Sequence, residues 1–189
     1  VLIPLQDTPG ARPGQVVVAE IVQQPREHNQ PVGKVIYILC KSGAPGIDTE
    51  IAIRNLNLTH EWPEGVEEEA EGFGDTVPEE MKQGRRDLRE LPLVTIDGAD
   101  ARDFDDAVYA QRRKNGWRLV VAIADVSSYV KPGSPLDREA ETRATSVYFP
   151  GRVIPMLPEA LSNGLCSLKP DEDRLCLVCD MSINESGKV

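Results

Sequence analysis

The chain has 189 residues, enough for one or two domains, and its 31 acidic and 21 basic residues give a net charge of −10. No stretch approaches the roughly 20 apolar residues of a membrane-spanning helix, and no signal peptide is visible, so we expect no membrane association. Residues 61–80 hold nine acids and no base, and so account for nine of the ten net charges. Since the remainder is near neutral, the global charge neither supports nor excludes RNA binding.

The N-terminal part has the pattern of a small β domain. Two β-type runs rich in valine and isoleucine, Gln15–Val22 and Val32–Cys40, are separated by a polar loop that contains proline. Short strands with Gly and Pro turns are typical of a small β-barrel. Ile47 and Ile51 recur at loosely helical spacing, which predicts a short helix after Gly46.

An acidic segment, Glu61–Glu80, follows this domain. It fits either an acidic interaction tail or a solvated helix that connects two domains, and we favour the connecting helix. Gly72, Gly74 and Pro78 interrupt the segment. We therefore place the domain boundary within it.

The second half alternates strands with one helix. Trp117–Asp125 is a nearly continuous apolar run, which predicts a strand buried on both faces. It forms a predicted hairpin with Asp106–Arg113 across Lys114–Gly116, and Leu175–Met181 is a further expected strand. Ser134, followed by proline and, three residues on, by an aspartate, predicts the N-terminus of a helix.

The cysteines show no metal-binding pattern. Cys176 and Cys179 have C-x-x-C spacing, but no second pair and no nearby histidine completes a zinc site. They lie in an alternating apolar run, so we expect buried strand cysteines. Reduced thiols fit a cytoplasmic protein.

Five aspartates crowd into ten residues of the run LVTIDGADARDFDD (93–106). Asp97 ends a short β-type run, Leu93–Ile96, and Asp103, Asp105 and Asp106 arrive together before the next strand. Crowded carboxylates raise one another's pKa, and a cation among them keeps the group ionised. Carboxylate oxygens favour hard ions such as Mg²⁺ or Mn²⁺, and two such ions can stabilise both the attacking and the leaving oxygen of a phosphodiester.

Two other interpretations of the aspartates fit the sequence less well. An acidic surface turn is the common one for an Asp-rich loop, but β-type runs flank this loop and place it at the rim of a sheet. A calcium loop of the EF-hand type fails on spacing, because Val108 and Lys114 stand where that loop needs Gly and Glu.

The segment TIDGADARDFDDAVY resembles the signature of the catalytic domain of the ribonuclease II and ribonuclease R exoribonucleases, the RNB family. The resemblance continues through VAIADVSSYV, PLDREAETRATSVYFPGRVIPMLPEALSNGLCSL and DRLCLVCDM, and covers residues 86–189. DARDFDDAVY and LSNGLCSL are similar to the ribonuclease R branch rather than to ribonuclease II. The N-terminal β domain resembles the second cold-shock domain of that branch.

The resemblance implies an α+β chain: a partial OB-type β-barrel followed by the N-terminal, mixed α/β part of an RNB catalytic domain. The expected divisions are a cold-shock-like domain over 1–60, an acidic connecting segment over 61–85 and a partial catalytic domain over 86–189. The chain is expected to be an internal fragment, truncated at both ends, of a longer protein.

The function implied by the resemblance is processive hydrolysis of single-stranded RNA from its 3′ end, with Mg²⁺ or Mn²⁺ as cofactor and nucleoside 5′-monophosphates as products. The parent protein is expected to be a monomeric cytoplasmic enzyme. The isolated chain is expected to be inactive and prone to self-association. Two rival functions are an RNA-binding module without catalysis and a structural Ca²⁺-binding domain.

The matched pattern assigns metal and catalytic roles to Asp97, Asp103, Asp105 and Asp106. Neighbouring Asp105 and Asp106 cannot point the same way on an extended backbone, so we expect them to play different parts. Asp100 lies outside the pattern and is expected to face solvent.

Five further residues are candidates for binding RNA. Tyr148 matches the position that stacks on bases, with a core tyrosine as the alternative. Asn163 and Ser167 belong to SNGLCSL, for which RNA contact and a simple turn are equally supported. Lys34 and Arg26 are candidates for an RNA-binding face of the β domain.

Overall fold

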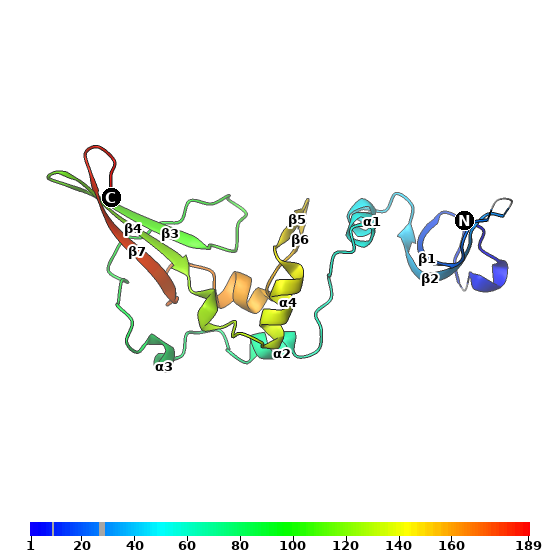
Figure 1. Ribbon diagram of the computed structural model, residues 1–189, viewed down its shortest axis with the longest axis horizontal. Coiled ribbons are helices and arrows are strands. Elements are labelled where there is room, and N and C mark those ends of the chain that lie inside the picture. Colours follow the sequence, from blue (N-terminus) through cyan, green and yellow to red (C-terminus); the bar gives the residue numbers. More distant parts are fainter. Residues whose placement is uncertain (9, 27–28) are drawn as a thin grey trace. The chain divides into compact units, whose positions relative to one another are not determined.

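The computed structural model describes residues 1–8, 10–26 and 29–189. The chain divides into two compact units, Val1–His60 and Glu61–Val189 (Figure 1). Among the described residues, no helix is both long enough and apolar enough to cross a membrane.

The first unit is built on two antiparallel strands, β1 (Gln15–Gln23) and β2 (Val32–Lys41), which confirm the two predicted β-type runs. A short 3-10 helix, η1 (Leu5–Asp7), precedes them, and the predicted helix follows as α1 (Ile47–Asn55). Ile53 is fully buried. Within the described part of this unit the sheet has two strands, so the expected OB-type barrel is partial and does not close.

The acidic segment lies in the second unit and contributes to its core. It forms two short helices, α2 (Val66–Glu71) and α3 (Glu79–Lys82). Val66 and Ala70 are buried on one side of α2, while its glutamates are mostly exposed. Glu69 accepts a 2.9 Å hydrogen bond from the backbone N–H of Leu136. The segment therefore packs against the rest of the second unit.

The second unit contains an antiparallel sheet with the strand order β3 (Asp106–Arg113), β4 (Gly116–Ala124), β7 (Cys176–Asn184) (Figure 1). The predicted β3–β4 hairpin is confirmed. Gly116 has φ of +133°, and a Cβ there would lie 2.0 Å from the carbonyl oxygen of Ile183, so the turn requires glycine.

The prediction that the Trp117–Asp125 strand is buried on both faces is wrong. Val120 and Ala122 are buried, whereas Trp117 and Ile123 are 46% and 45% exposed. An antiparallel sheet commonly covers only one face, and side chains alternate between the faces. The same geometry exposes Cys179 on the edge strand β7, so the expectation of a buried cysteine is wrong there.

The remaining elements form a helical layer beside a small hairpin. They are η2 (Val126–Ser128), α4 (Pro135–Arg143), β5 (Val147–Phe149), β6 (Arg152–Ile154) and the π-helical turn η3 (Ala160–Leu165). The predicted start of α4 is confirmed, because the Ser134 hydroxyl accepts a hydrogen bond from the Asp137 N–H.

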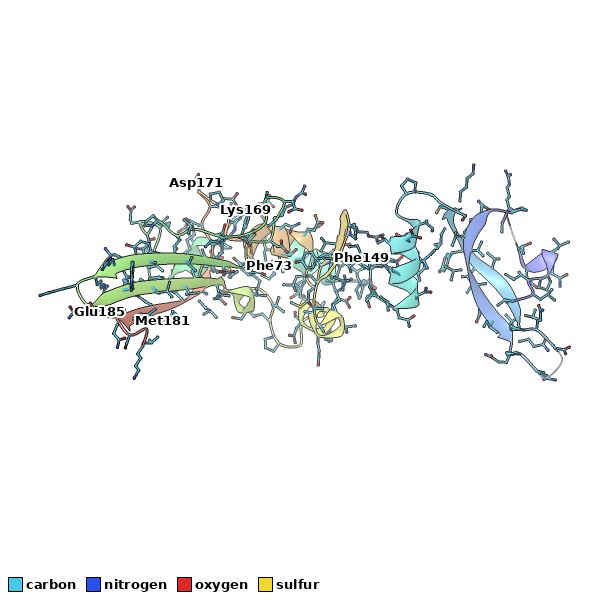
Figure 2. All side chains as sticks on the ribbon, turned by 90° about the horizontal axis from the view of Figure 1, so that it is seen from above. Phe73, Phe149, Lys169, Asp171, Met181 and Glu185 are labelled. Carbon is cyan, nitrogen blue, oxygen red and sulfur yellow. The ribbon has the colours of Figure 1, made fainter. Side chains whose placement is uncertain are left out.

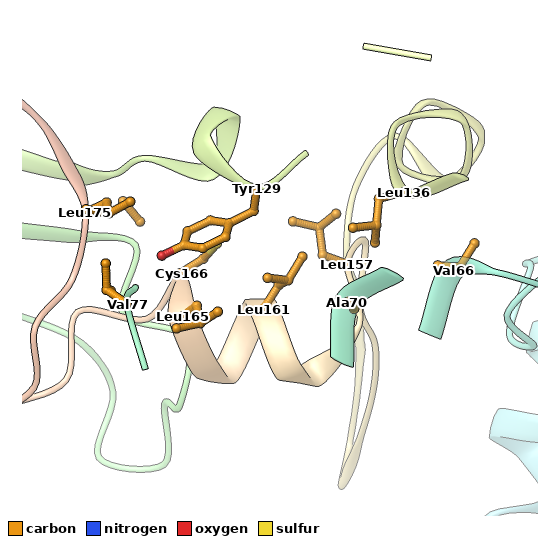
Figure 3. Close-up of a cluster of buried hydrophobic side chains, with 11 residues drawn as sticks. Val66, Ala70, Val77, Tyr129, Leu136, Leu157, Leu161, Leu165, Cys166 and Leu175 are labelled. Atoms are coloured by element: carbon orange, nitrogen blue, oxygen red, sulfur yellow. The ribbon is translucent and has the colours of Figure 1, made fainter. Parts of the chain in front are cut away.

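The core of this unit gathers around η3. Leu161 and Leu165 of η3 are at most 1% exposed and lie beneath Tyr129 and Leu157 (Figure 3). Tyr129 also meets the Phe73 ring edge-on, with ring centroids 5.3 Å apart. The segment that carries SNGLCSL is therefore packed into the core.

Arg143, the last residue of α4, contacts residues at the start of the second unit. Its buried guanidinium pairs with the buried Glu139 carboxylate at 2.7 Å and donates to the carbonyl oxygens of Pro155 and Glu61. It also lies 3.4 Å from the centre of the Trp62 ring. These contacts satisfy a buried charge that would otherwise be costly.

Candidate active site

The aspartates lie on a loop that begins and ends at a single β-bridge. Val94 and Val108 exchange two backbone hydrogen bonds of 2.9 and 2.8 Å. The predicted Leu93–Ile96 strand is therefore reduced to one paired residue, and Ile96 is 85% exposed. The aspartate loop, residues 95–105, projects from the sheet at the start of β3.

Three backbone contacts hold the second half of the loop. The Asp105 carbonyl accepts a 2.9 Å hydrogen bond from the Ala124 N–H at the end of β4. The Phe104 N–H donates to the Ser167 hydroxyl at 3.0 Å, and the Phe104 carbonyl accepts from the Leu168 N–H at 2.8 Å. The sheet and the η3 segment thus fix the backbone that carries the aspartates.

The structure brings the four predicted aspartates into electrostatic range of one another. Partial burial raises the pKa of Asp105, and the negative charges of Asp103, Asp106 and Asp97 raise it further. All four belong to the predicted set, and their metal and catalytic roles stay predictions. Such a group concentrates negative charge at the sheet rim.

The donor set of this loop is chemically suited to a hard divalent cation, since it consists of carboxylates alone. Across residues 1–8, 10–26 and 29–189, however, no three Asp, Glu, His or Cys side chains already converge on one cation position. Repulsion between uncompensated carboxylates favours a spread arrangement. Cation binding here requires the carboxylates to rotate toward one another.

Tyr148 lies beside the aspartates. Its ring on β5 is 64% exposed, and its hydroxyl donates a 2.7 Å hydrogen bond to the Asp103 carboxylate. That hydrogen bond, followed by burial and by the charges of Asp103 and Asp105, raises the pKa of Tyr148. The neighbouring Phe149 is partly buried. The exposed ring leaves a face open to a base, and stacking by Tyr148 stays a prediction.

Ser167 and Asn163, predicted together, occupy different surroundings. Ser167 is fully buried, and its hydroxyl is bonded to the aspartate loop. Asn163 lines an open cleft with six acidic and three basic side chains. Two of them, Lys169 and Asp171, are labelled in Figure 2. An excess of acids does not favour phosphate contact. RNA contact by either residue remains a prediction.

Lys34 and Arg26 belong to the first unit. Lys34 is an exposed residue of β2, and Arg26 is exposed in the segment before β2, where it forms a bridge with Asn29. Both side chains are accessible to a ligand. Exposure alone does not test their predicted RNA contacts, which stay predictions.

Sequence reasoning missed the network around Asp125, which directly follows β4. The Asp125 carboxylate is almost fully buried and accepts hydrogen bonds from Arg85, Ser127 and Ser128 at 2.6–2.7 Å. Burial alone would raise the pKa of Asp125, but these bonds and the Arg85 charge outweigh it and lower the pKa to about 2. The network anchors the end of the strand that contacts Asp105.

The first unit is a small β domain, and the second is an α/β domain that carries the aspartate loop. Residues 85–189 match the RNB domain family, and residues 1–63 match a cold shock domain family. The chain belongs to the RNB family.

Several relatives of the chain are ribonuclease R proteins. Ribonuclease R of Vibrio parahaemolyticus is 59% identical over 100% of this chain, and ribonuclease R of Acidithiobacillus ferrooxidans is 62% identical over 93%. The chain spans 23% and 40% of these relatives' lengths. The structure of Mycoplasma genitalium RNase R in complex with double-stranded RNA matches with a TM-score of 0.90 and 32% identity, covering 99% of this chain and 34% of that one.

Proposed function

We propose that this chain is part of an exoribonuclease that hydrolyses RNA from its 3′ end and releases nucleoside 5′-monophosphates. The observation that carries the proposal is the aspartate loop: four carboxylates held in electrostatic range at the rim of an RNB-family sheet, with an exposed tyrosine hydrogen-bonded to one of them. Ribonuclease R relatives, and the RNA-bound state of one of them, support RNA as the substrate.

The aspartates and Tyr148 have different proposed roles in this site. Asp97, Asp103, Asp105 and Asp106 would hold Mg²⁺ or Mn²⁺. When bound, the cation neutralises the phosphodiester and lowers the pKa of the attacking water. Tyr148 would stack on a base beside the loop, which is a contact that tolerates any sequence. Contacts with the 2′-hydroxyl would distinguish RNA from DNA.

Labelled oligonucleotides test this function in the full-length enzyme. With Mg²⁺, a 3′-terminal label should appear at once as a mononucleotide, while a 5′ label stays in long RNA until a short limit product forms. DNA of the same sequence should resist. Internal cleavage, or attack from the 5′ end, would contradict the proposal.

The isolated 189-residue chain should not turn over the same RNA. It spans about a quarter of a ribonuclease R relative, and the remaining segments would position the scissile phosphate. Misplacement by about 1 Å costs roughly 10²-fold in rate. Mononucleotide release near the full-length rate would show that the rest of the enzyme is dispensable for chemistry.

Replacing Tyr148 with alanine should weaken binding of short RNA roughly 5- to 150-fold, because one base loses a stacking contact of about 1–3 kcal/mol. The length of the limit product should change with it, while the bond that is cleaved stays the same. The matched control is Tyr148→Phe, which keeps the ring and removes the hydrogen bond to Asp103. A product ladder unchanged in Tyr148→Ala would mean that the ring does not grip RNA.

A further inference from the structure

We propose that Ser167 is a positioning residue whose buried hydroxyl fixes the backbone of the aspartate loop, from which the carboxylates rotate onto a cation. The inference rests on the proposed function, because it assigns Ser167 a part in the same site. Ser167 was expected to contact RNA or to form a turn. Its contacts instead point to the backbone of the loop.

The Ser167 hydroxyl uses both its donor and its acceptor capacity on the loop. It donates to the Arg102 carbonyl at 2.7 Å and accepts from the Phe104 N–H at 3.0 Å. The two bonds bracket Asp103. A third bond, from the Leu168 N–H to the Phe104 carbonyl, adds a backbone contact from the same segment.

Ser167 is itself held on both sides, so it can act as a fixed support. Its N–H donates to the Gly164 carbonyl at 3.1 Å, and its carbonyl accepts from Arg174 Nε at 2.9 Å. The Arg174 side chain is only 6% exposed and also binds the Gly164 carbonyl. Leu165 and Cys166, just before the serine, are part of the core.

Backbone position limits which points these carboxylates can reach by rotation, because aspartate has a short side chain with few rotamers. Asp103 lies between the two residues that Ser167 binds, and Asp105 follows Phe104 directly. Without the hydroxyl, the Phe104 N–H and the Arg102 carbonyl lose a partner next to a fully buried position. The loop would then shift to find water, and the carboxylates would move with it.

The test measures Mn²⁺ affinity of the full-length protein by electron paramagnetic resonance, with wild type, Ser167→Ala and Ser162→Ala compared. Ser162 lies on η3, five residues before Ser167, and its hydroxyl donates to the Pro158 carbonyl at 3.4 Å rather than to the aspartate loop. Loss of a group that orients metal ligands typically weakens metal binding about 10- to 100-fold, and we expect this for Ser167→Ala. Ser162→Ala should bind Mn²⁺ like wild type, and metal-free RNA affinity should be unchanged in both.

The Mg²⁺ concentration for half-maximal hydrolysis should rise in parallel for Ser167→Ala. A purely structural role would lower the unfolding temperature without changing the Mn²⁺ affinity of the folded protein, and that result would overturn the inference. If Ser167→Ala does not fold, Ser167→Cys replaces it. Its sulfur is of similar size but is a weak hydrogen-bonding group, so it should also weaken Mn²⁺ binding.

The inference and the proposed function can fail separately. If wild type binds Mn²⁺ and Ser167→Ala does not, but no RNA is hydrolysed by wild type, the positioning role stands and the proposed activity falls. If wild type hydrolyses RNA and Ser167→Ala matches it in rate and in Mn²⁺ affinity, the positioning role falls and the activity stands.

Discussion

Replacing Asp105 with asparagine in the full-length protein should slow RNA hydrolysis by at least about 10²-fold, comparable to the loss of one group that stabilises charge in a transition state. The substitution keeps the side-chain shape and removes one negative charge from the set of four. Asp105 is the aspartate on which the charges of Asp97, Asp103 and Asp106 converge. RNA binding should survive, because removing an acid does not weaken contacts with phosphate.

Asp100→Asn is the matched control for this experiment. Asp100 is an exposed residue of the same loop and lies outside the predicted set. Single-turnover hydrolysis and filter binding, measured on all three proteins, separate chemistry from affinity. Equal loss of binding and hydrolysis in a folded Asp105→Asn protein, or equal effects of the two substitutions, would count against a catalytic role.

Replacing Asp125 with alanine should lower the free energy of unfolding of the second unit by about 3 kcal/mol, the lower end of what breaking a buried ion pair costs. The lower end applies because only one side chain of the pair is deeply buried. The Asp125 side chain is 5% exposed, whereas that of its partner Arg85 is 33% exposed. Two serine hydroxyls lose their acceptor at the same time.

The destabilisation caused by Asp125→Ala should become smaller as the pH falls. The folded-state pKa of Asp125, about 2, is below its usual value of 3.8, so its contribution is complete above about pH 4 and is lost as the pH falls toward 2. Wild type and variant should therefore converge in stability at acid pH. A gap that stays constant from pH 7 to pH 2.5 would refute the assigned ionisation.

Denaturation followed by tryptophan fluorescence suits this measurement, because the two tryptophans of the chain, Trp62 and Trp117, both lie in the second unit. Asp180→Ala is a useful control. Asp180 pairs with Arg118 at 2.7 Å near the surface, where ion pairs contribute little. Its removal should change stability far less than removal of Asp125.

Local signals predicted most of the elements. The strands β1 and β2, the β3–β4 hairpin and the capped start of α4 follow from alternation, turn residues and a Ser-Pro pattern that act within a few residues. The predictions that failed depend on contacts between residues that lie far apart in the sequence. Leu93–Ile96 has the composition of a strand, but only Val94 finds a partner.

In the acidic segment, the many charged residues obscure the spacing that is typical of a buried helix face. Its nine acids suggested a solvated connection, yet Val66 and Ala70 lie four residues apart on one side of α2 and are buried. That spacing is present in the sequence and is diagnostic of a packed helix face. The glutamates between and after these residues instead favour a solvated segment.

The closeness of the four aspartates could be predicted, because their spacing is a local property of the chain, while their roles stay predictions. The supports of the loop could not be predicted, since they come from distant residues: Ser167 is 63 positions from Phe104, and Arg85 is 40 positions from Asp125. No periodicity in the sequence relates such pairs. They become visible only when the fold brings them within hydrogen-bonding distance.

Titration of the full-length protein with Mg²⁺ and Mn²⁺, in the presence and absence of an oligoribonucleotide and with the products identified, tests the central claim most directly. The claim is that the aspartate loop of this RNB-family chain is a metal-dependent hydrolytic site. It predicts saturable cation binding and release of nucleoside 5′-monophosphates that appears only with the cation. Tight RNA binding with no mononucleotide released at any concentration of either cation would contradict it.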